Sequence, residues 1–305
     1  MVMSDARARG HLACLFTIIL WGTTFISTKV LLRDFKPVEI LFLRFALGFL
    51  ALWLASAKIS KALSRGEEFL FALAGLSGIC LYYLLENIAL IYTSASNVGI
   101  IISVAPIFTA LLAYLFLKEE KPVVSFYAGA LIAFAGVALL SLNGSRLQLN
   151  PLGDLLALSA AFVWAIYSIL VRKIGELGLD MIYCTRKLFA WGLIFIAPIL
   201  ALSNGCPGIS AILKPINLIN LLFLGLGASA LCFVTWNYSV RALGAVLTSA
   251  YIYLVPVVTA SAAWLVLDEK ISHLALGGII LTIAGLLLSQ WRKVRPQAGK
   301  MLSKL

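Results

Sequence analysis

Residues 106–119 (PIFTALLAYLFLKE) and residues 256–269 (PVVTASAAWLVLDE) read as two copies of one segment. They lie 150 positions apart, and each starts with a proline, continues as an apolar run and closes with a glutamate. Matched pairs extend the likeness outward at offsets of 143 to 150: Leu15 and Leu158, Trp21 and Trp164, Asn87 and Asn237, Ala95 and Ala245, Gly129 and Gly278, Gly136 and Gly285. We therefore predict a duplicated chain with small insertions and deletions.

Both copies are too apolar for a water-soluble domain. The 305 residues are 62% hydrophobic and 12% charged, with a mean hydropathy of +1.02, whereas soluble domains carry about 25% charged residues. A membrane-spanning helix needs about 20 mostly apolar residues. Ten runs qualify: 11–32, 37–57, 68–92, 93–117, 122–142, 151–173, 180–203, 215–240, 244–266 and 271–291. We expect an all-α transmembrane protein with five spans in each copy.

An odd number of spans gives the two copies opposite orientations in the membrane. With a cytoplasmic N-terminus, fifteen Lys and Arg residues fall on the inner side, six on the outer side and three within spans. The positive-inside rule then places both termini in the cytoplasm. The predicted organisation is a cytoplasmic N-terminus (1–10), a first repeat (11–142), a second repeat (151–291) and a basic cytoplasmic tail (292–305).

Inverted repeats favour a transporter, because one half can adopt the shape that the other had and so exchange inward-open and outward-open states. An enzyme is disfavoured, since the two histidines lie at span ends and no hydrolase, metalloprotease or P-loop motif is present. A channel would need a continuous polar stripe or a filter sequence, and neither is found. We expect no cofactor and no bound metal, because the five cysteines are scattered without metal spacing.

The net charge of +11 is interpreted as topology signals and contacts with anionic headgroups, not as a nucleic-acid surface. The expected partners are the lipid bilayer and a small-molecule substrate, with no nucleic acid, in a monomer or a homodimer. The expected location is the inner (plasma) membrane of the cell, as a multi-pass protein.

Two segments resemble a known family. Residues 21–44 (WGTTFISTKVLLRDFKPVEILFLR) and 87–119 (NIALIYTSASNVGIIISVAPIFTALLAYLFLKE) are similar to the EamA family of the drug/metabolite transporter superfamily. The resemblance covers about residues 11 to 291. It implies ten helices, a central cavity between the halves, and export or exchange of small metabolites such as amino acids. The second repeat departs from the pattern near residues 165–187, where the position of Arg44 falls on Lys187 or Arg186.

Charged and aromatic side chains within the spans are the candidates for a substrate cavity, because charge inside a bilayer is expensive and intramembrane ionisable residues are commonly functional. Arg44 and Glu86 lead, with snorkelling to headgroups and an ordinary ion pair as the respective alternatives. Trp21 and Trp164 occupy matching mid-span positions, away from the interfacial aromatic belts. The complete set of predicted cavity residues is Trp21, Arg44, Glu86, Asn87, Asn97, Trp164, Tyr167, Trp236, Asn237 and Tyr251, and Tyr253 is a weaker candidate.

Gating residues are predicted from the inverted geometry. A first-half group around Lys29, Arg44 and Glu86 would lie on the outer side, and a second-half group around Lys187 and Trp236 on the inner side, although Lys29 could be merely interfacial. Pro106 and Pro256 should bend their helices mid-span and shape a cavity or a hinge. The leading substrate is an amino acid or a derivative, because one cationic and one anionic side chain near a cavity suit a zwitterion. Nucleosides, sugars and amphipathic drugs remain open, as do direction and proton coupling.

Overall fold

The computed structural model describes residues 2–57, 63–93, 95–117, 123–141, 150–203, 208–258, 261 and 273–290. Every regular element within these ranges is helical, which agrees with the all-α expectation. The first half contains α1 (Val2–Leu31), α2 (Pro37–Ala55), α3 (Arg65–Ala74), η1 (Gly75–Leu81), α4 (Tyr82–Tyr92), α5 (Ala95–Ile102), α6 (Ala105–Phe116) and α7 (Val124–Ser141). The second half contains α8 (Pro151–Glu176), α9 (Met181–Leu202), α10 (Ile209–Ile212), α11 (Pro215–Leu222), η2 (Phe223–Leu231), α12 (Cys232–Leu243), α13 (Ala245–Ala250), η3 (Tyr251–Leu254) and α15 (His273–Gln290).

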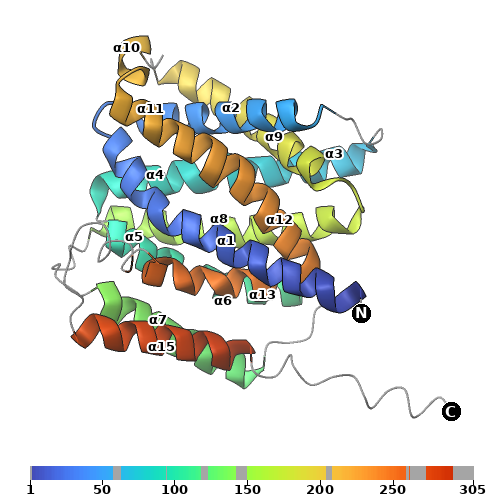
Figure 1. Cartoon of the computed structure of the whole chain (residues 1–305), viewed down its shortest axis with the longest axis vertical. Helices are drawn as coiled ribbons and strands as arrows, with labels where there is room; N and C mark the ends of the chain where they lie inside the picture. Colours follow the sequence, from blue (N-terminus) through green and yellow to red (C-terminus); the bar gives the residue numbers. More distant parts are fainter. Residues whose placement is uncertain are drawn as a thin grey trace.

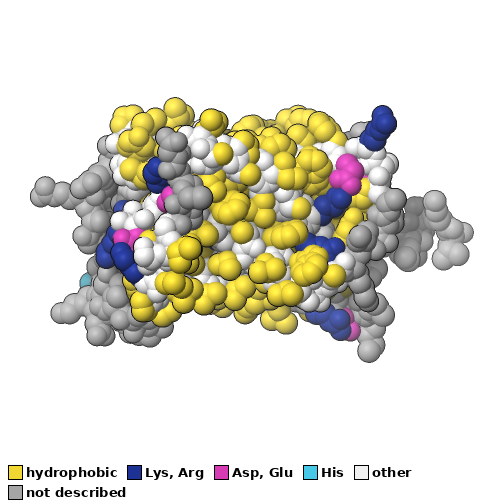
Figure 2. Space-filling view, turned by 90° about the horizontal axis from the view of Figure 1, so that it is seen from above, with side chains coloured by type: hydrophobic (Ala, Val, Ile, Leu, Met, Phe, Trp, Pro, Cys, Tyr) yellow, Lys and Arg dark blue, Asp and Glu magenta, His cyan; other side chains and the backbone are white. Residues whose placement is uncertain are grey.

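The helices have the length and composition of a membrane protein. Within the described residues, seven helices are long and apolar enough to cross a membrane, and three shorter apolar helices accompany them, Val124–Leu139, Ala245–Val258 and Leu276–Ser289. They form a bundle of roughly side-by-side rods (Figure 1). Figure 2 shows hydrophobic side chains across the middle of one face, with charged side chains gathered toward its two ends. This distribution suits a hydrocarbon layer bounded by two polar interfaces.

Capping residues set several helix starts. The Asn150 side chain accepts hydrogen bonds from the first turn of α8, and the Asp180 carboxylate accepts one from the Tyr183 amide at the start of α9. Each cap satisfies backbone N–H groups that would otherwise lack a partner at the end of a helix. The caps at Asn150 and Asp180 therefore fix where α8 and α9 begin.

The two predicted hinge prolines lie at interruptions of their helices. Pro106 occupies the first turn of α6, directly after the break that separates α5 from α6. Pro256 follows the 3₁₀ turn η3, in the short apolar helix Ala245–Val258. Proline lacks an N–H donor, and its ring clashes with the preceding turn. This explains why the regular α-helix is interrupted on the N-terminal side of each proline.

Helices α7 and α15 pack closely at one edge of the bundle (Figure 1). A Cβ added to Gly129 would lie 2.6 Å from the Gly285 carbonyl oxygen, and one added to Gly136 would lie 2.6 Å from the Gly278 carbonyl oxygen. The glycines that the repeat matches thus face one another within the chain, where small residues let helix backbones approach.

Each half contains a π-helical segment in the middle of a long helix, η1 between α3 and α4 and η2 between α11 and α12. Residues 75 and 225 are glycines at equivalent places in the two segments. Short π-helical segments are rare in proteins, and those that occur often lie at functional sites. The sequence contains no signal for them beyond these glycines.

Packing corrects one sequence correspondence between the halves. A Cβ on Gly225 would meet the Arg44 carbonyl oxygen at 3.2 Å. A Cβ on the matching Gly75 would meet the Leu188 carbonyl oxygen at 2.9 Å. Arg44 is therefore equivalent to Leu188, and its expected alignment with Lys187 or Arg186 was wrong. The expected alignment matched Arg44 to another positively charged residue, whereas the backbone contacts of Gly75 and Gly225 match it to Leu188.

The buried phenylalanines that follow these two residues support the same register. The Phe45 and Phe189 rings pack edge to face, with centroids 5.0 Å apart, where α2 and α9 meet. Their offset of 144 is the same as that of Arg44 and Leu188.

Candidate functional site

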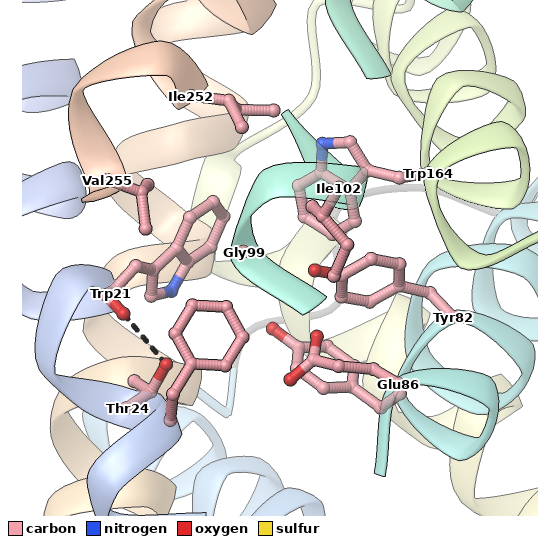
Figure 3. A pocket seen from close by; sticks show the side chains of 11 residues that line it. Trp21, Thr24, Tyr82, Glu86, Gly99, Ile102, Trp164, Ile252 and Val255 are labelled. Atoms are coloured by element: carbon pink, nitrogen blue, oxygen red, sulfur yellow. Dashed lines mark hydrogen bonds between the residues drawn. The ribbon is translucent and has the colours of Figure 1, made fainter. Parts of the chain in front are cut away.

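A cavity of about 40 Å³ lies among the central helices, which is room for a few water molecules. Side chains from α1, α4, α5, α8 and the segment around η3 face it (Figure 3). The residues that line it are Trp21, Thr24, Phe25, Tyr82, Tyr83, Glu86, Gly99, Ile102, Trp164, Ile252 and Val255. Most of this wall is aromatic or aliphatic, and Glu86 is the one charged residue among the described lining residues.

Three tryptophans form a cluster beside the cavity. The Trp21 ring packs edge to face on Trp164 at 5.3 Å between centroids and lies 4.9 Å from Trp236, and Trp164 and Trp236 are 5.7 Å apart. The Trp21 indole N–H donates to the Ala228 carbonyl oxygen at 3.0 Å, which ties α1 to the π segment η2. Such aromatic pairs stabilise beyond their buried area by about 0.5–1.5 kcal/mol each. The cluster therefore joins the two halves at the level of the cavity.

Glu86 places a carboxylate on the cavity wall. Its side chain is 4% exposed, and Figure 3 shows it extending from α4 beside Tyr82 into the cavity. Tyr82 lies one helical turn earlier, so its hydroxyl faces the same carboxylate. The Thr24 hydroxyl, across the cavity, is occupied by donation to the Trp21 carbonyl oxygen at 2.8 Å.

Arg44 is buried behind the cavity wall. It is 1% exposed, its Nε donates to the Ser229 hydroxyl at 3.0 Å, and its guanidinium lies 4.3 Å from the Tyr83 ring centroid. One terminal nitrogen, Nη2, has no hydrogen-bond partner in the part of the chain that the structure describes. Tyr83 lines the cavity and Arg44 does not, so in this conformation Tyr83 stands between the cationic side chain and the cavity.

The predicted cavity residues are thus divided. Trp21, Glu86 and Trp164 lie on the wall, and Trp236 contacts the two tryptophans from behind instead of lying with an inner gate, as its repeat position suggested. The remaining predicted residues do not line the cavity: Arg44, Asn87, Asn97, Tyr167, Asn237 and Tyr251.

The polar residues away from the wall hold helices together. The Tyr167 hydroxyl donates to the Asn237 amide oxygen at 2.8 Å, and the Asn237 amide donates to Thr185 at 3.1 Å. The matching Asn87 donates to the Pro37 carbonyl oxygen at 3.3 Å, at the start of α2.

Two other predicted residues have partners near helix ends. The Asn97 amide donates to the Asp154 carboxylate at 2.5 Å, and the Tyr251 hydroxyl pairs with a His11 ring nitrogen at 2.6 Å. Tyr253 is fully buried, and within the described ranges its hydroxyl has no hydrogen-bond partner.

Sequence reasoning missed the residues that complete the wall. Tyr82 precedes Glu86 by one turn, and Thr24 and Phe25 follow Trp21 by one turn, so helical spacing alone could have added them. Gly99, Ile102, Ile252 and Val255 carry no such signal, because small and aliphatic residues are common on every face of a membrane helix.

Ion pairs join the two halves at opposite ends of the molecule. Lys187 on α9 pairs with Glu68 on α3 at 2.6 Å. Asp34, in the loop after α1, pairs with Lys214 at 2.9 Å and accepts a hydrogen bond from Asn217 at 2.7 Å. These hydrogen bonds hold the pKa of the Asp34 carboxyl below its usual value. Lys29 is exposed and lies in neither cluster.

Comparison with known proteins adds independent findings. The family model described as "EamA-like transporter family" matches residues 8–142 and again residues 151–291. An uncharacterized transporter of Archaeoglobus fulgidus is 32% identical over 289 residues, which cover 93% of this chain and 98% of the relative. A probable terminal-alkyne amino-acid exporter of Streptantibioticus cattleyicolor is 28% identical over 278 residues, covering 90% and 91% of the two chains. A crystal structure at 20% identity superposes with a TM-score of 0.73, over 96% of this chain and 99% of its own, which shows a shared fold.

Proposed function

Because the chain belongs to the EamA-like transporter family, we propose that this multi-pass membrane protein is a secondary carrier of amino acids or their derivatives. It works by alternating access between two inverted five-helix repeats, in efflux or exchange, in the inner (plasma) membrane with both termini in the cytoplasm. The observation that carries the substrate class is the burial of one cation, Arg44, and one carboxylate, Glu86, around an aromatic cavity between the halves.

The matched contacts of the two halves support alternating access. Phe45 meets Phe189 where α2 packs on α9, and each π segment carries a glycine against the other half. A pseudo-symmetric interface of this kind lets one half rock against the other around a fixed central site. The Lys187–Glu68 and Asp34–Lys214 pairs lie at opposite ends of the molecule, and we assign them to the inner and outer gates.

The chemistry of the site suits a zwitterion. A carboxylate of the substrate would accept hydrogen bonds from the Arg44 guanidinium, whose Nη2 has no partner among the described residues, once Tyr83 moves aside. The ammonium group would face Glu86 and the rings of Trp21 and Trp164, which attract cations through their π faces. The amino-acid exporter of Streptantibioticus cattleyicolor is consistent with this class of substrate.

A second candidate class is an amphipathic or aromatic compound, including drugs and nucleosides. The aromatic wall of Trp21, Phe25, Tyr82, Tyr83 and Trp164 favours it. A compound of this class would use the rings for stacking and leave Arg44 unengaged, so Arg44→Ala would not change its transport.

Counterflow in proteoliposomes tests the proposal. Vesicles are loaded with an unlabelled mixture of neutral L-amino acids, and the uptake of each labelled amino acid is followed at trace concentration. Transient accumulation above equilibrium, strongly reduced at trace concentration in Trp21→Ala and Arg44→Ala, is the expected result. Trp53→Ala is the matched control, because Trp53 is 49% exposed and contributes nothing to the cavity. If no amino acid shows counterflow while a labelled nucleoside or lipophilic cation does, the amino-acid class is wrong.

A further inference from the structure

Glu86 is a buried carboxylate without a cation in ion-pair contact. Among the described residues, the ion pairs within 4.0 Å join Arg172 to Glu176, Lys187 to Glu68 and Lys214 to Asp34, and none of them includes Glu86. The carboxylate instead faces an aromatic cavity with room for only a few waters. An ionised carboxylate in such surroundings loses most of its hydration and gains no ion-pair partner, so the neutral acid is favoured.

The groups around Glu86 compensate an ionised carboxylate only in part, because the Tyr82 hydroxyl hydrogen-bonds to it while Arg44 stays outside ion-pair distance. On its own helix the titratable neighbours are Tyr82 and Tyr83, and a tyrosine is neutral at physiological pH. From α2 the charged neighbour is Arg44, which is directed to Ser229 and to the Tyr83 ring. The facing residues of α1, α5 and α8 on the cavity wall are uncharged.

We propose that Glu86 is the proton-binding site through which this carrier couples transport to the proton gradient, an inference that rests on the proposed function. In the empty occluded carrier Glu86 holds a proton. When the cavity opens and a substrate ammonium enters, the O–H bond of the carboxyl breaks, and the proton leaves to water on that side. The electron pair stays on the carboxylate, which accepts hydrogen bonds from the ammonium. On the opposite side the ammonium departs and a proton from that solution rejoins Glu86.

This cycle exchanges one proton for one substrate molecule and needs no other reactant. A neutral zwitterion exchanged for a proton moves one net positive charge in the direction of the proton. Inward proton flow would therefore drive outward substrate flow. With the membrane potential clamped at zero, the concentration ratio at equilibrium should change about tenfold per pH unit.

The first test is infrared spectroscopy of the purified protein in proteoliposomes, titrated with pH and without substrate. A protonated carboxyl shows a carbonyl stretch that a carboxylate lacks. We expect this band at neutral pH in the wild type, its loss in Glu86→Gln, and its bleaching by a mixture of neutral L-amino acids. Glu39→Gln is the matched control, because Glu39 is also buried but accepts a hydrogen bond from the Lys36 amide at 2.7 Å, and it should keep the band. The absence of the band in the wild type would overturn the proposal.

The second test imposes a pH gradient on proteoliposomes that contain the same amino-acid mixture, with a fluorescent pH indicator inside. Wild-type vesicles should accumulate substrate against its gradient and move protons in the opposite direction. Glu86→Gln should do neither, and Glu86→Asp, which restores a carboxyl, should recover part of the coupling. Wild-type counterflow without any response to the pH gradient would refute proton coupling and leave the carrier function intact. Absence of wild-type counterflow would instead refute the proposed substrates, and the infrared band would still decide whether Glu86 binds a proton.

Discussion

The contact between α7 and α15 allows a sharp prediction about stability. A Cβ added to Gly285 would lie 2.3 Å from the Ala133 amide nitrogen and 2.6 Å from the Gly129 carbonyl oxygen. Ordinary contact for such an atom begins at 3.4 Å, so the two backbones must separate by about 1 Å, and a gap of this size forfeits roughly a quarter to a half of each dispersion contact. Overpacking of this kind costs about 1–3 kcal/mol. Gly285→Ala should therefore destabilise the protein despite the better helix propensity of alanine.

Gly277→Ala is the matched variant, because Gly277 lies on the same helix and a Cβ there would meet nothing within 4 Å. Both substitutions share the propensity gain of about 1 kcal/mol, so the difference between them isolates the clash. Reversible unfolding in mixed micelles, titrated with SDS, measures that difference as a free energy of unfolding. We expect Gly285→Ala to be less stable than Gly277→Ala by about 1–3 kcal/mol. Equal stability of the two variants would refute the close packing of α7 on α15.

Three further predictions concern Arg44, the Tyr167–Asn237 hydrogen bond and the Asp34–Lys214 pair. Arg44→Ala should raise the half-saturation concentration for amino-acid counterflow about 10–100-fold, since a charged hydrogen bond contributes about 1.5–3 kcal/mol. Arg44→Lys should restore only part of the affinity, because lysine lacks the planar guanidinium that can hold a carboxylate through two N–H groups. Tyr167→Phe should lower the free energy of unfolding by about 1–3 kcal/mol in the same SDS titration, because it leaves the buried Asn237 oxygen unpaired. The pKa of Asp34 lies below its usual 3.8, so its contact with Lys214 stabilises above pH 3.8 and is lost as pH falls through the lowered pKa. As the pH falls through this range, the amide hydrogen exchange of residues 32–36, corrected for its intrinsic pH dependence, should become faster. The Asp34→Asn variant should show this faster exchange already at neutral pH.

The sequence was sufficient for what depends on composition and periodicity. The apolar runs predicted ten helices, and the described residues contain seven long and three shorter apolar helices. Mid-span tryptophans at matched positions predicted cavity-lining side chains, and Trp21 and Trp164 both lie on the cavity wall. The predicted alignment of α2 with α9 was wrong, because only the backbone packing reveals that Arg44 corresponds to Leu188. The π segments and the position of Tyr83 in front of Arg44 were also out of reach, because they depend on how helices from both halves pack around the cavity.

The equivalence of Arg44 with Leu188 makes the two halves chemically unlike at the central site, which suits an asymmetric substrate. Arg44 corresponds to Leu188, and Glu86 corresponds at the offset of 150 to Trp236, so both buried ionisable residues of the central site belong to the first half. The second half contributes Trp164 and Trp236 at the same level. A zwitterion held by Arg44 and Glu86 would then stay with the first half, while the second half presents aromatic surface that can slide across it without breaking a charged contact. Under the proposed alternating-access cycle, this division would let the barrier move past the substrate while the charged contacts with the first half are kept.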